Sequence, residues 1–333
     1  MFLTIDLCAG IGGIRRGFEL TGGFKNVLSA ETDATACAVY RHRYNGDDAN
    51  NDLTSVDFKQ KVTAIDYDVL LAGFPCQAFS RAGKQAGFGD SEKGVIFNHI
   101  AEIVKDTRPQ CVFLENVDNL VSHDGGKTFR VILETFSRKL NYHVIGANFS
   151  CDNIIEPNHF IRNARDFGLP QNRPRTYIIG VDMRRFGAKI GNLSEPLPTK
   201  PSEQVSERLR KYRSLDDVLD KKVDGRYFIS AGYLSTLEKH AAREKKRGNG
   251  FGYRIVNLPE NKNPLANTLL ATGGSGRERN LVIDETNGRK YAGKTIPPKK
   301  TAVNDKYIRF MTPNEWGKLQ GFIDYAFDDF SFP

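Results

Sequence analysis

The stretch that decides the fold is residues 2–13, which read FLTIDLCAGIGG. An apolar run, Phe2–Leu7, is followed at once by a turn that contains Gly10, Gly12 and Gly13. A short apolar run next to glycines is typical of a buried strand. Glycines after such a strand let the backbone approach a ligand closely. Because the G-x-G-x-x-G spacing and a Walker lysine are missing, the turn favours a nucleoside without phosphates, or it is simply a tight turn.

Strand-like and helix-like segments alternate over the first 180 residues. Five further apolar runs follow: Val27–Glu31, Val69–Ala72, Cys111–Glu115, His143–Ala147 and Thr176–Val181. Apolar residues recur at helical spacing over Gly94–Lys105 and Thr128–Leu140. This alternation predicts an α/β fold with a doubly wound sheet of parallel strands and right-handed crossovers. Ligands of such sheets bind beyond the carboxyl ends of the strands, so the residues after each run are the functional candidates.

Two carboxylates stand at positions that suit a nucleoside. Glu31 ends the second run, where an acidic residue can accept both ribose hydroxyls. Asp52 follows at a position that suits an adenine amino group. Each residue also fits the interpretation of a surface or capping acid. Together with the glycine turn, they predict a nucleoside pocket.

A cysteine and a glutamate follow the third and fourth runs. Cys76 comes directly after Pro75, which fixes the backbone at the expected end of a strand. Glu115 ends the next run. A thiol and a carboxyl group at the same edge of a sheet predict a nucleophile and a proton donor. The alternative for Cys76 is a buried packing residue.

Two arginines precede the last run of the sheet. Arg173 and Arg175 are two residues apart, so an extended segment points both the same way. Guanidinium groups in such a place suit an anion or a carbonyl group. Exposed ion pairs are the alternative interpretation.

Length and composition bound the class of protein. The chain has 333 residues, of which 39% are hydrophobic and 26% charged, as in a globular protein of one or two domains. No apolar run approaches the ~18 residues of a membrane span, and the N-terminus lacks the basic region of a secretory signal. Five cysteines without a C-x-x-C pair argue against a disulfide framework and a metal site. We therefore expect a cytoplasmic protein with reduced thiols and no membrane partner.

The net charge of +8 is unevenly distributed. Residues 181–305 hold 25 Lys and Arg against 15 Asp and Glu, and the rest of the chain holds 23 against 25. A basic domain beside a near-neutral one suggests a nucleic acid partner, or else a basic surface kept for solubility. Prolines cluster between residues 196 and 201, which indicates a linker. We expect a catalytic domain at 1–180, a basic domain at 181–305 and a return segment at 306–333.

Six sequence blocks, in this order, resemble the DNA (cytosine-5)-methyltransferases. They are DLCAGIGG (6–13), GFPCQAFS (73–80), GVIF (94–97), LENV (114–117), QNRPR (171–175) and RFMTPNE (309–315), the last followed by LQGF (319–322). The similarity spans nearly the whole chain. It implies a Rossmann-like sheet that binds S-adenosylmethionine (SAM), with a smaller target-recognition domain over 181–305. Within that domain, segments 247–253 and 267–280 resemble family recognition loops for a short GC-containing duplex site.

The resemblance also implies the cofactor contacts. SAM is expected over the glycine turn, beside Asp6, Cys8 and Pro75. Glu31 is expected on the ribose and Asp52 near the adenine amino group. Cys8 stands where the family commonly has phenylalanine, which implies a less snug adenine contact.

The implied chemistry acts on a cytosine flipped out of double-stranded DNA. Cys76 attacks carbon 6, and Glu115 binds ring nitrogen 3 and the exocyclic amine. Arg175 holds the base carbonyl, and Arg173 lies nearer the phosphates. Carbon 5 then accepts the methyl group.

The family usually has a further block after LQGF, with an Asn-Ser or Asn-Ala turn and a helix. Residues 323–333 do not contain it, and no displaced copy is found near the N-terminus. We expect either a truncated chain or a second polypeptide that supplies the block to an otherwise monomeric protein. Without it, Leu3, Ile5 and the turn at 10–13 would lose a covering surface. The chain alone would then bind SAM weakly.

Two other functions remain open at this point. A tRNA cytosine-5 methyltransferase shares the motifs but carries a Cys-Phe-Thr signature, and residues 181–305 contain no cysteine. The second function is that of a DNA-binding subunit that is catalytically inactive on its own. A SAM-binding measurement on the isolated chain separates this subunit from an active enzyme.

Overall fold

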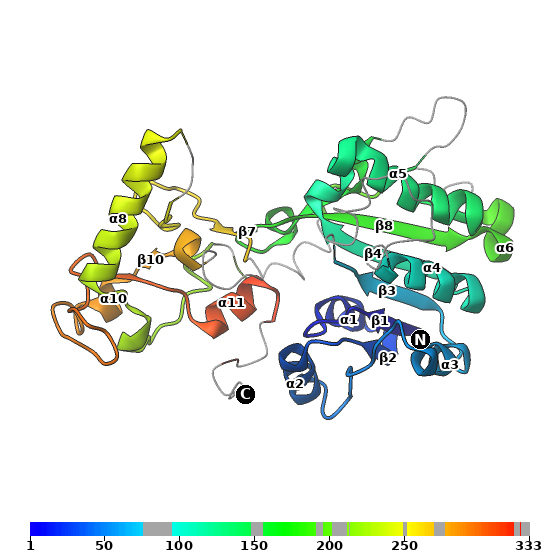
Figure 1. Cartoon of the computed structure of the whole chain (residues 1–333), viewed down its shortest axis with the longest axis horizontal. Coiled ribbons are helices and arrows are strands. Elements are labelled where there is room, and N and C mark those ends of the chain that lie inside the picture. Colours follow the sequence, from blue (N-terminus) through cyan, green and yellow to red (C-terminus); the bar gives the residue numbers. More distant parts are fainter. Residues whose placement is uncertain are drawn as a thin grey trace. The chain divides into compact units, whose positions relative to one another are not determined.

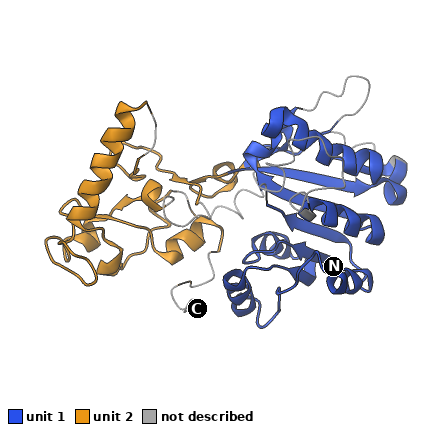
Figure 2. Cartoon of the chain, viewed as in Figure 1, with its two compact units in different colours: residues 1–162, 174–199, 332–333 blue, residues 163–173, 200–331 orange. Residues whose placement is uncertain are grey.

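The computed structural model describes residues 1–75, 95–147, 156–190, 196–201, 212, 214–248, 252–269, 277–322 and 327. The chain forms two compact units (Figure 2). Unit 1 consists of Met1–Arg162, Pro174–Thr199 and Phe332–Pro333, and unit 2 of Asn163–Arg173 and Lys200–Ser331.

The unit boundaries differ from those expected for the domains. Residues 181–199 belong to unit 1 rather than to the basic domain. Two buried side chains explain this, because Asp182 pairs with Arg108, and Arg162 donates to the carbonyl groups of Leu197 and Pro198. Residues 306–331 belong to unit 2. What each range does remains a prediction.

Unit 1 is built on a mixed sheet (Figure 1). Its main path runs β2-β1-β3-β4-β8-β5, and β6 pairs with β8. The strands are β1 (Phe2–Leu7), β2 (Phe24–Ala30), β3 (Val69–Gly73), β4 (Cys111–Val117), β5 (Tyr142–Val144), β6 (Ile161–Asn163) and β8 (Pro174–Asp182). All six expected strands are present, so the α/β sheet is confirmed.

One strand runs against the expectation of a parallel sheet. β8 is antiparallel to both β4 and β5. Apolar periodicity is the same for a buried strand of either direction, so the sequence pattern could not show this. The consequence is functional: the beginning of β8, not its end, lies at the carboxyl edge of β4, where Arg175 is the register partner of Val117.

Helices cover both faces of this sheet. Val112 and Leu114 of β4 pack into the main core with α4 (Val95–Thr107) and α5 (Lys127–Glu134). Phe113 points to the other face, where its ring centroid lies 5.1 Å from that of Phe18 on α1 (Gly13–Glu19). The remaining helices of unit 1 are α2 (Ala34–Arg43), α3 (Val56–Thr63) and α6 (Met183–Phe186). No helix in the described part of the chain is long and apolar enough to cross a membrane.

The expected exposure of the first strand is wrong in part. Ile5 is fully buried and Leu3 is half-buried without any further segment. Ile5 reaches this burial because it belongs to the main core, which α4 and α5 help to form. Exposure of β1 therefore gives no support for a missing covering helix.

The described elements of unit 2 are one long helix, α8, and several short ones. They are β7 (Gln171–Asn172), α8 (Ala231–Lys246), β9 (Ala266–Asn267), β10 (Val282–Ile283), α10 (Glu285–Gly288), β11 (Ile308–Arg309) and α11 (Pro313–Leu319). β10 pairs with β11, and β7 with β9. The Ser230 hydroxyl accepts from the Tyr233 amide and caps α8.

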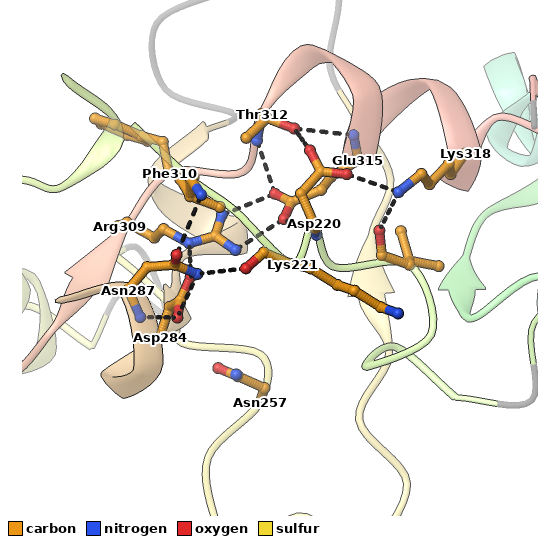
Figure 3. A network of polar contacts seen from close by, with 12 residues as sticks. Asp220, Lys221, Asn257, Asp284, Asn287, Arg309, Phe310, Thr312, Glu315 and Lys318 are labelled. Atoms are coloured by element: carbon orange, nitrogen blue, oxygen red, sulfur yellow. Dashed lines mark hydrogen bonds and ion pairs between the residues drawn. The ribbon is translucent and has the colours of Figure 1, made fainter. Parts of the chain in front are cut away.

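A buried polar network ties the RFMTPNE block to the rest of unit 2 (Figure 3). The Arg309 side chain is 0% exposed and binds the equally buried Glu315 through two hydrogen bonds of 2.8 Å. Its Nε donates to Asp284 at 2.8 Å. Glu315 also accepts from the amide group of Thr312, the N-cap residue of α11, and from the amide group of Asp220. The block therefore holds α10, α11 and the β10–β11 pair together.

Replacing Arg309 with alanine is expected to lower the free energy of unfolding by about 3–5 kcal/mol, because it leaves buried carboxylates without a counter-charge. Urea unfolding can be followed by the fluorescence of Trp316, the only tryptophan of the chain, which lies on α11. Arg289→Ala is the matched control, since its pair with Glu285 is exposed and such pairs contribute little. Equal unfolding midpoints for the two variants would show that the network does not stabilise unit 2.

Candidate active site at the carboxyl edge of the sheet

The ends of three strands meet at one edge of the sheet. In the register, Leu7 faces Ala72, and Gly73 faces Glu115. A Cβ atom built on Gly73 would lie 3.5 Å from Oε2 of Glu115 and 3.8 Å from the carbonyl oxygen of Cys8. Gly73 therefore lies between the glycine turn and Glu115, and the first, second and fourth motif blocks are neighbours in space.

Glu115 and Arg175 form an ion pair at this edge. Nε of Arg175 lies 3.0 Å from Oε1 of Glu115. The Arg175 side chain is 12% exposed and the Glu115 side chain 21%, so the pair is largely buried but still reached by solvent. Nη1 of Arg175 donates to the carbonyl oxygen of Pro174 at 2.7 Å, which fixes the guanidinium group. A carboxylate and a guanidinium group are thus held together where a planar, polar ring could meet both.

The backbone before Cys76 is tied to the same strand end. The buried Asn116 side chain donates from Nδ2 to the carbonyl oxygen of Phe74 at 2.9 Å. Pro75 follows and is exposed. Cys76 itself lies outside the described residues. Its two predecessors reach the carboxyl edge next to Glu115, as the sequence predicts.

The glycine turn is joined to Glu31 by a hydrogen bond. The Gly10 amide donates to Oε2 of Glu31 at 2.8 Å. The amides of Thr32 and Asp33 donate to Oε1 at 2.8 and 2.9 Å. A carboxylate accepts about four hydrogen bonds, so Oε2 keeps a free acceptor position beside the turn. This arrangement fits a ribose hydroxyl.

Gly10 and Gly12 need to be glycines, because their φ angles of +56° and +81° lie in the left-handed region. Gly13, the third glycine of the turn, begins α1. Cys8 also has a positive φ of 53°. The carboxyl ends of β1 and β2 thus present a tightly curved backbone beside an acidic side chain, with no basic side chain from the turn itself. That donor set fits a nucleoside better than a phosphate.

Two titratable groups of the turn are neutral at pH 7. Burial raises the pKa of Asp6 to about 8, opposed by the backbone amide and the charge of Arg15. Neither Asp6 oxygen has a hydrogen-bond partner of good geometry among the described residues. Burial, together with the charges of Glu31 and Asp6, raises the pKa of Cys8 to about 12. Cys8 is therefore a thiol and not a competing nucleophile.

Asp52 is exposed and forms part of a turn before α3. Its Oδ1 accepts from the amide and the hydroxyl of Thr54 at 2.9 and 2.7 Å. These hydrogen bonds lower the pKa of Asp52, so the carboxylate is charged. Asp52 is therefore a surface acid of this turn and not a helix cap, since the N-cap of α3 is Ser55. Oδ2 faces no partner in the described chain and can still accept from an amino group.

The two arginines fall in different units. Arg175 lies in unit 1 beside Glu115, and Arg173 ends the first segment of unit 2. The Arg173 amide donates to Oδ1 of Asn163 at 2.9 Å, and its carbonyl accepts from the Ala164 amide at 3.2 Å. The structure therefore places Arg175 beside Glu115, while the contacts given for Arg173 are those of its backbone.

Two residues of the edge were missed by sequence reasoning. Asn116 is the third residue of the LENV block, and Tyr44 donates from Oη to the Gly12 carbonyl oxygen at 2.6 Å. Tyr40 and Tyr44 are four residues apart and share a helical face, but no sequence signal connected that face with residues 10–13.

The fold is similar to that of known methyltransferases. Over 100% of this chain and 90% of the other, the structure resembles a methyltransferase of Entamoeba histolytica, EhMeth, with a TM-score of 0.63 and 17% identity. It also resembles DNMT2 of Spodoptera frugiperda, with a TM-score of 0.62, 15% identity, and coverage of 100% of this chain and 92% of that one. At these identities the likeness shows the fold alone.

Sequence comparisons go further. The chain is 40% identical to the type II methyltransferase M.HpaII of Haemophilus parainfluenzae, over 97% of this chain and 80% of that one. It is 40% identical to M.NgoBI of Neisseria gonorrhoeae, over 99% of this chain and 100% of that one. Residues 2–333 match the profile of the C-5 cytosine-specific DNA methylases. The chain therefore belongs to the C-5 cytosine-specific DNA methylase family and is a SAM-dependent enzyme.

Proposed function

We propose that the carboxyl edge of the unit 1 sheet is the active site, where carbon 5 of a cytosine from duplex DNA is methylated. The observation that carries this proposal is the ion pair between Glu115 and Arg175 beside Gly73. It supplies a carboxylate and a guanidinium group, fixed on neighbouring strands, at the point where the chain leads into Cys76. Cytosine offers complementary groups, namely a ring nitrogen, an exocyclic amine and a carbonyl.

We assign the cofactor contacts to the turn and its neighbours. Gly10, Gly12 and Gly13 would take SAM against their backbone, with Asp6 and Cys8 supporting the turn as neutral groups. Glu31 would accept from the ribose through Oε2. Bound SAM supplies an electrophilic methyl group.

Asp52 would accept from the adenine amino group through Oδ2. Pro75 would close the pocket on the catalytic side. Both are exposed in the structure, as a contact with a ligand requires.

The base contacts follow from hydrogen-bond chemistry. Glu115 would share a proton with ring nitrogen 3 and accept from the exocyclic amine. Arg175 would donate to the base carbonyl, and Arg173 would lie nearer the phosphates. Since the base must leave the duplex to reach these groups, the reaction requires base flipping.

Cys76 would supply the electrons for the reaction. Its thiolate forms a bond to carbon 6, and the ring's electron pair moves to carbon 5 while Glu115 holds the proton at nitrogen 3. Carbon 5 takes the methyl group as the sulfonium sulfur keeps the bonding pair. Loss of the carbon-5 proton to a base then expels Cys76 by β-elimination.

We assign DNA recognition to unit 2. Its helix α8 ends in exposed Lys245, Lys246 and Arg247. Arg247 also pairs with the buried Glu244, with Nη1 and Oε1 3.2 Å apart. The two lysines form no ion pair in the described part of the chain, which leaves their charges available for phosphates. Segments 247–253 and 267–280 lie partly outside the described residues.

DNA affinity is expected to fall with salt at a log–log slope of about −5 to −7, for roughly 6–8 phosphate contacts. Changing Lys245 and Lys246 to glutamine should flatten the slope by about 2, if each contacts one phosphate. Fluorescence anisotropy at a series of salt concentrations measures this. Lys25→Gln with Lys105→Gln is the control, since these exposed lysines lie in unit 1. A slope near zero for the parent chain would contradict a basic DNA-binding face.

We further propose a modification-type enzyme of the cytoplasm, supported by relatives named type II methyltransferases. We also propose that a second polypeptide supplies the Asn-Ser or Asn-Ala turn and its helix. The support is that residues 323–333, which follow the LQGF block, contain no asparagine.

The proposed reaction is tested by the identity of its product. Labelled methyl groups from SAM should be recovered as 5-methyl-2′-deoxycytidine after digestion of a duplex. A tRNA transcript should remain unlabelled. Label in tRNA but not in DNA would overturn the assignment of the substrate.

A further inference from the structure

Tyr44 contacts the glycine turn at a different residue from Glu31. Its Oη donates to the Gly12 carbonyl oxygen at 2.6 Å. Its ring packs so closely that a Cβ atom on Gly12 would lie 2.3 Å from Cε2 of Tyr44. The turn is thus held at two points, through the Gly10 amide by Glu31 and through the Gly12 carbonyl by Tyr44.

Arg15 holds the Tyr44 ring in place. Its guanidinium carbon lies 3.8 Å from the ring centroid of Tyr44, and Arg15 is only 8% exposed. Nη1 donates to Oη of Tyr40 at 2.8 Å, and Nη2 pairs with Asp47 at 2.9 Å. A cation over an aromatic ring is attractive, most of all when it is partly desolvated.

The cluster is anchored in the sheet. Oη of Tyr40 lies 2.6 Å from Oγ of Ser29, which in turn accepts from Asn26 at 2.8 Å. Ser29 and Asn26 both belong to β2, the strand that ends next to Glu31. Tyr44 itself ends α2 at its C-cap. The turn, the helix and the strand therefore share one network of buried polar contacts.

We infer that Tyr44, with Arg15 stacked on its ring, is a positioning residue for SAM. It holds the Gly10–Gly13 turn in its left-handed conformation before the cofactor binds, so that binding does not have to order the turn. This inference rests on the proposed placement of SAM at the turn. Neither residue is required to touch the reacting atoms.

The test is Tyr44→Phe, which keeps the ring and removes only the hydroxyl group. Loss of the hydrogen bond to the Gly12 carbonyl should raise the Kd for SAM by roughly 3- to 10-fold. The KM for SAM should rise by a similar factor while kcat stays near its parent value, because the turn holds SAM equally in the ground and transition states. DNA affinity should not change.

Tyr67→Phe is the matched control. Its hydroxyl lies 2.5 Å from Oγ1 of Thr107, in the same unit and at the opposite edge of the sheet. It also loses one partly buried hydrogen bond, so both variants should melt at similar temperatures. An equal rise of the SAM Kd in Tyr67→Phe would reduce the effect of Tyr44 to general destabilisation and overturn the inference.

Two further variants make the result decisive. Arg15→Lys keeps the charge but not the flat guanidinium group. In the double variant Arg15→Lys/Tyr44→Phe, the loss of SAM-binding free energy should be smaller than the sum of the two single losses. Glu31→Ala serves as the reference for the proposed cofactor site. If Glu31→Ala weakens SAM binding and Tyr44→Phe does not, the inference about Tyr44 is wrong, while the proposed SAM site at the turn stands. If neither matters, the site at the turn is wrong.

Discussion

Replacing Cys76 with serine is expected to abolish methyl transfer. An ordinary thiol with a pKa near 8.5 is about 3% thiolate at pH 7, whereas a serine hydroxyl without an adjacent base supplies almost no alkoxide. Carbon 6 would then not be attacked, and carbon 5 would not become nucleophilic. SAM binding, measured by calorimetry, should persist, because the glycine turn and Glu31 do not depend on the thiol.

Cys111→Ser provides the matched control for this loss. Cys111 starts β4, at the edge of the sheet opposite to Glu115, and burial raises its pKa to about 12. Its replacement by serine should leave turnover near that of the parent chain. Turnover by Cys76→Ser at a similar rate would contradict a covalent mechanism.

Replacing Glu115 with glutamine is expected to lower turnover by about 10²-fold or more, the usual contribution of a positioned proton-transfer group. Glutamine keeps the shape and can still accept from Arg175, so the melting temperature should change little. It cannot share a proton with ring nitrogen 3. Single-turnover assays with saturating SAM and DNA would separate this chemical loss from weaker binding.

Glu102→Gln on α4 is the control, because Glu102 is 55% exposed and pairs with Lys59 away from the strand ends. It should retain full activity. A large fall in melting temperature for Glu115→Gln with normal turnover would show instead that the Glu115–Arg175 pair only stabilises the sheet.

Much of unit 1 could be predicted because its signals are local. Each apolar run is short and bounded, and the end of each run sets which residues reach the carboxyl edge. That reasoning placed Glu31 and the backbone before Cys76 correctly after strands, and Glu115 near the end of β4, which continues to Val117. It did not give the direction of β8, which depends on where the long segment after β5 returns. Only the structure explains how Arg175, at the start of a strand, meets Glu115 at the end of another.

Contacts between distant residues left no such signal. Tyr44 is 32 residues from Gly12, and Asp220 is 95 residues from Glu315. Arg309 looks like a surface residue by type, yet it is fully buried, because it pairs with Asp284 and Glu315 from two other places in the chain. In the part of unit 2 that the structure describes, the strands β7, β9, β10 and β11 have two residues each, too few for any periodicity to show.

The central claim is that Cys76 attacks the flipped cytosine, and trapping the adduct tests it most directly. The chain is incubated with SAM and a duplex in which 5-fluorocytosine replaces cytosine. Fluorine at carbon 5 cannot leave as a proton does, so methyl transfer should stop at the covalent adduct. Digestion and mass spectrometry should then find the modified base on Cys76. An adduct on Cys8, Cys37, Cys111 or Cys151, or methylation of ordinary duplex with no adduct at all, would contradict the account.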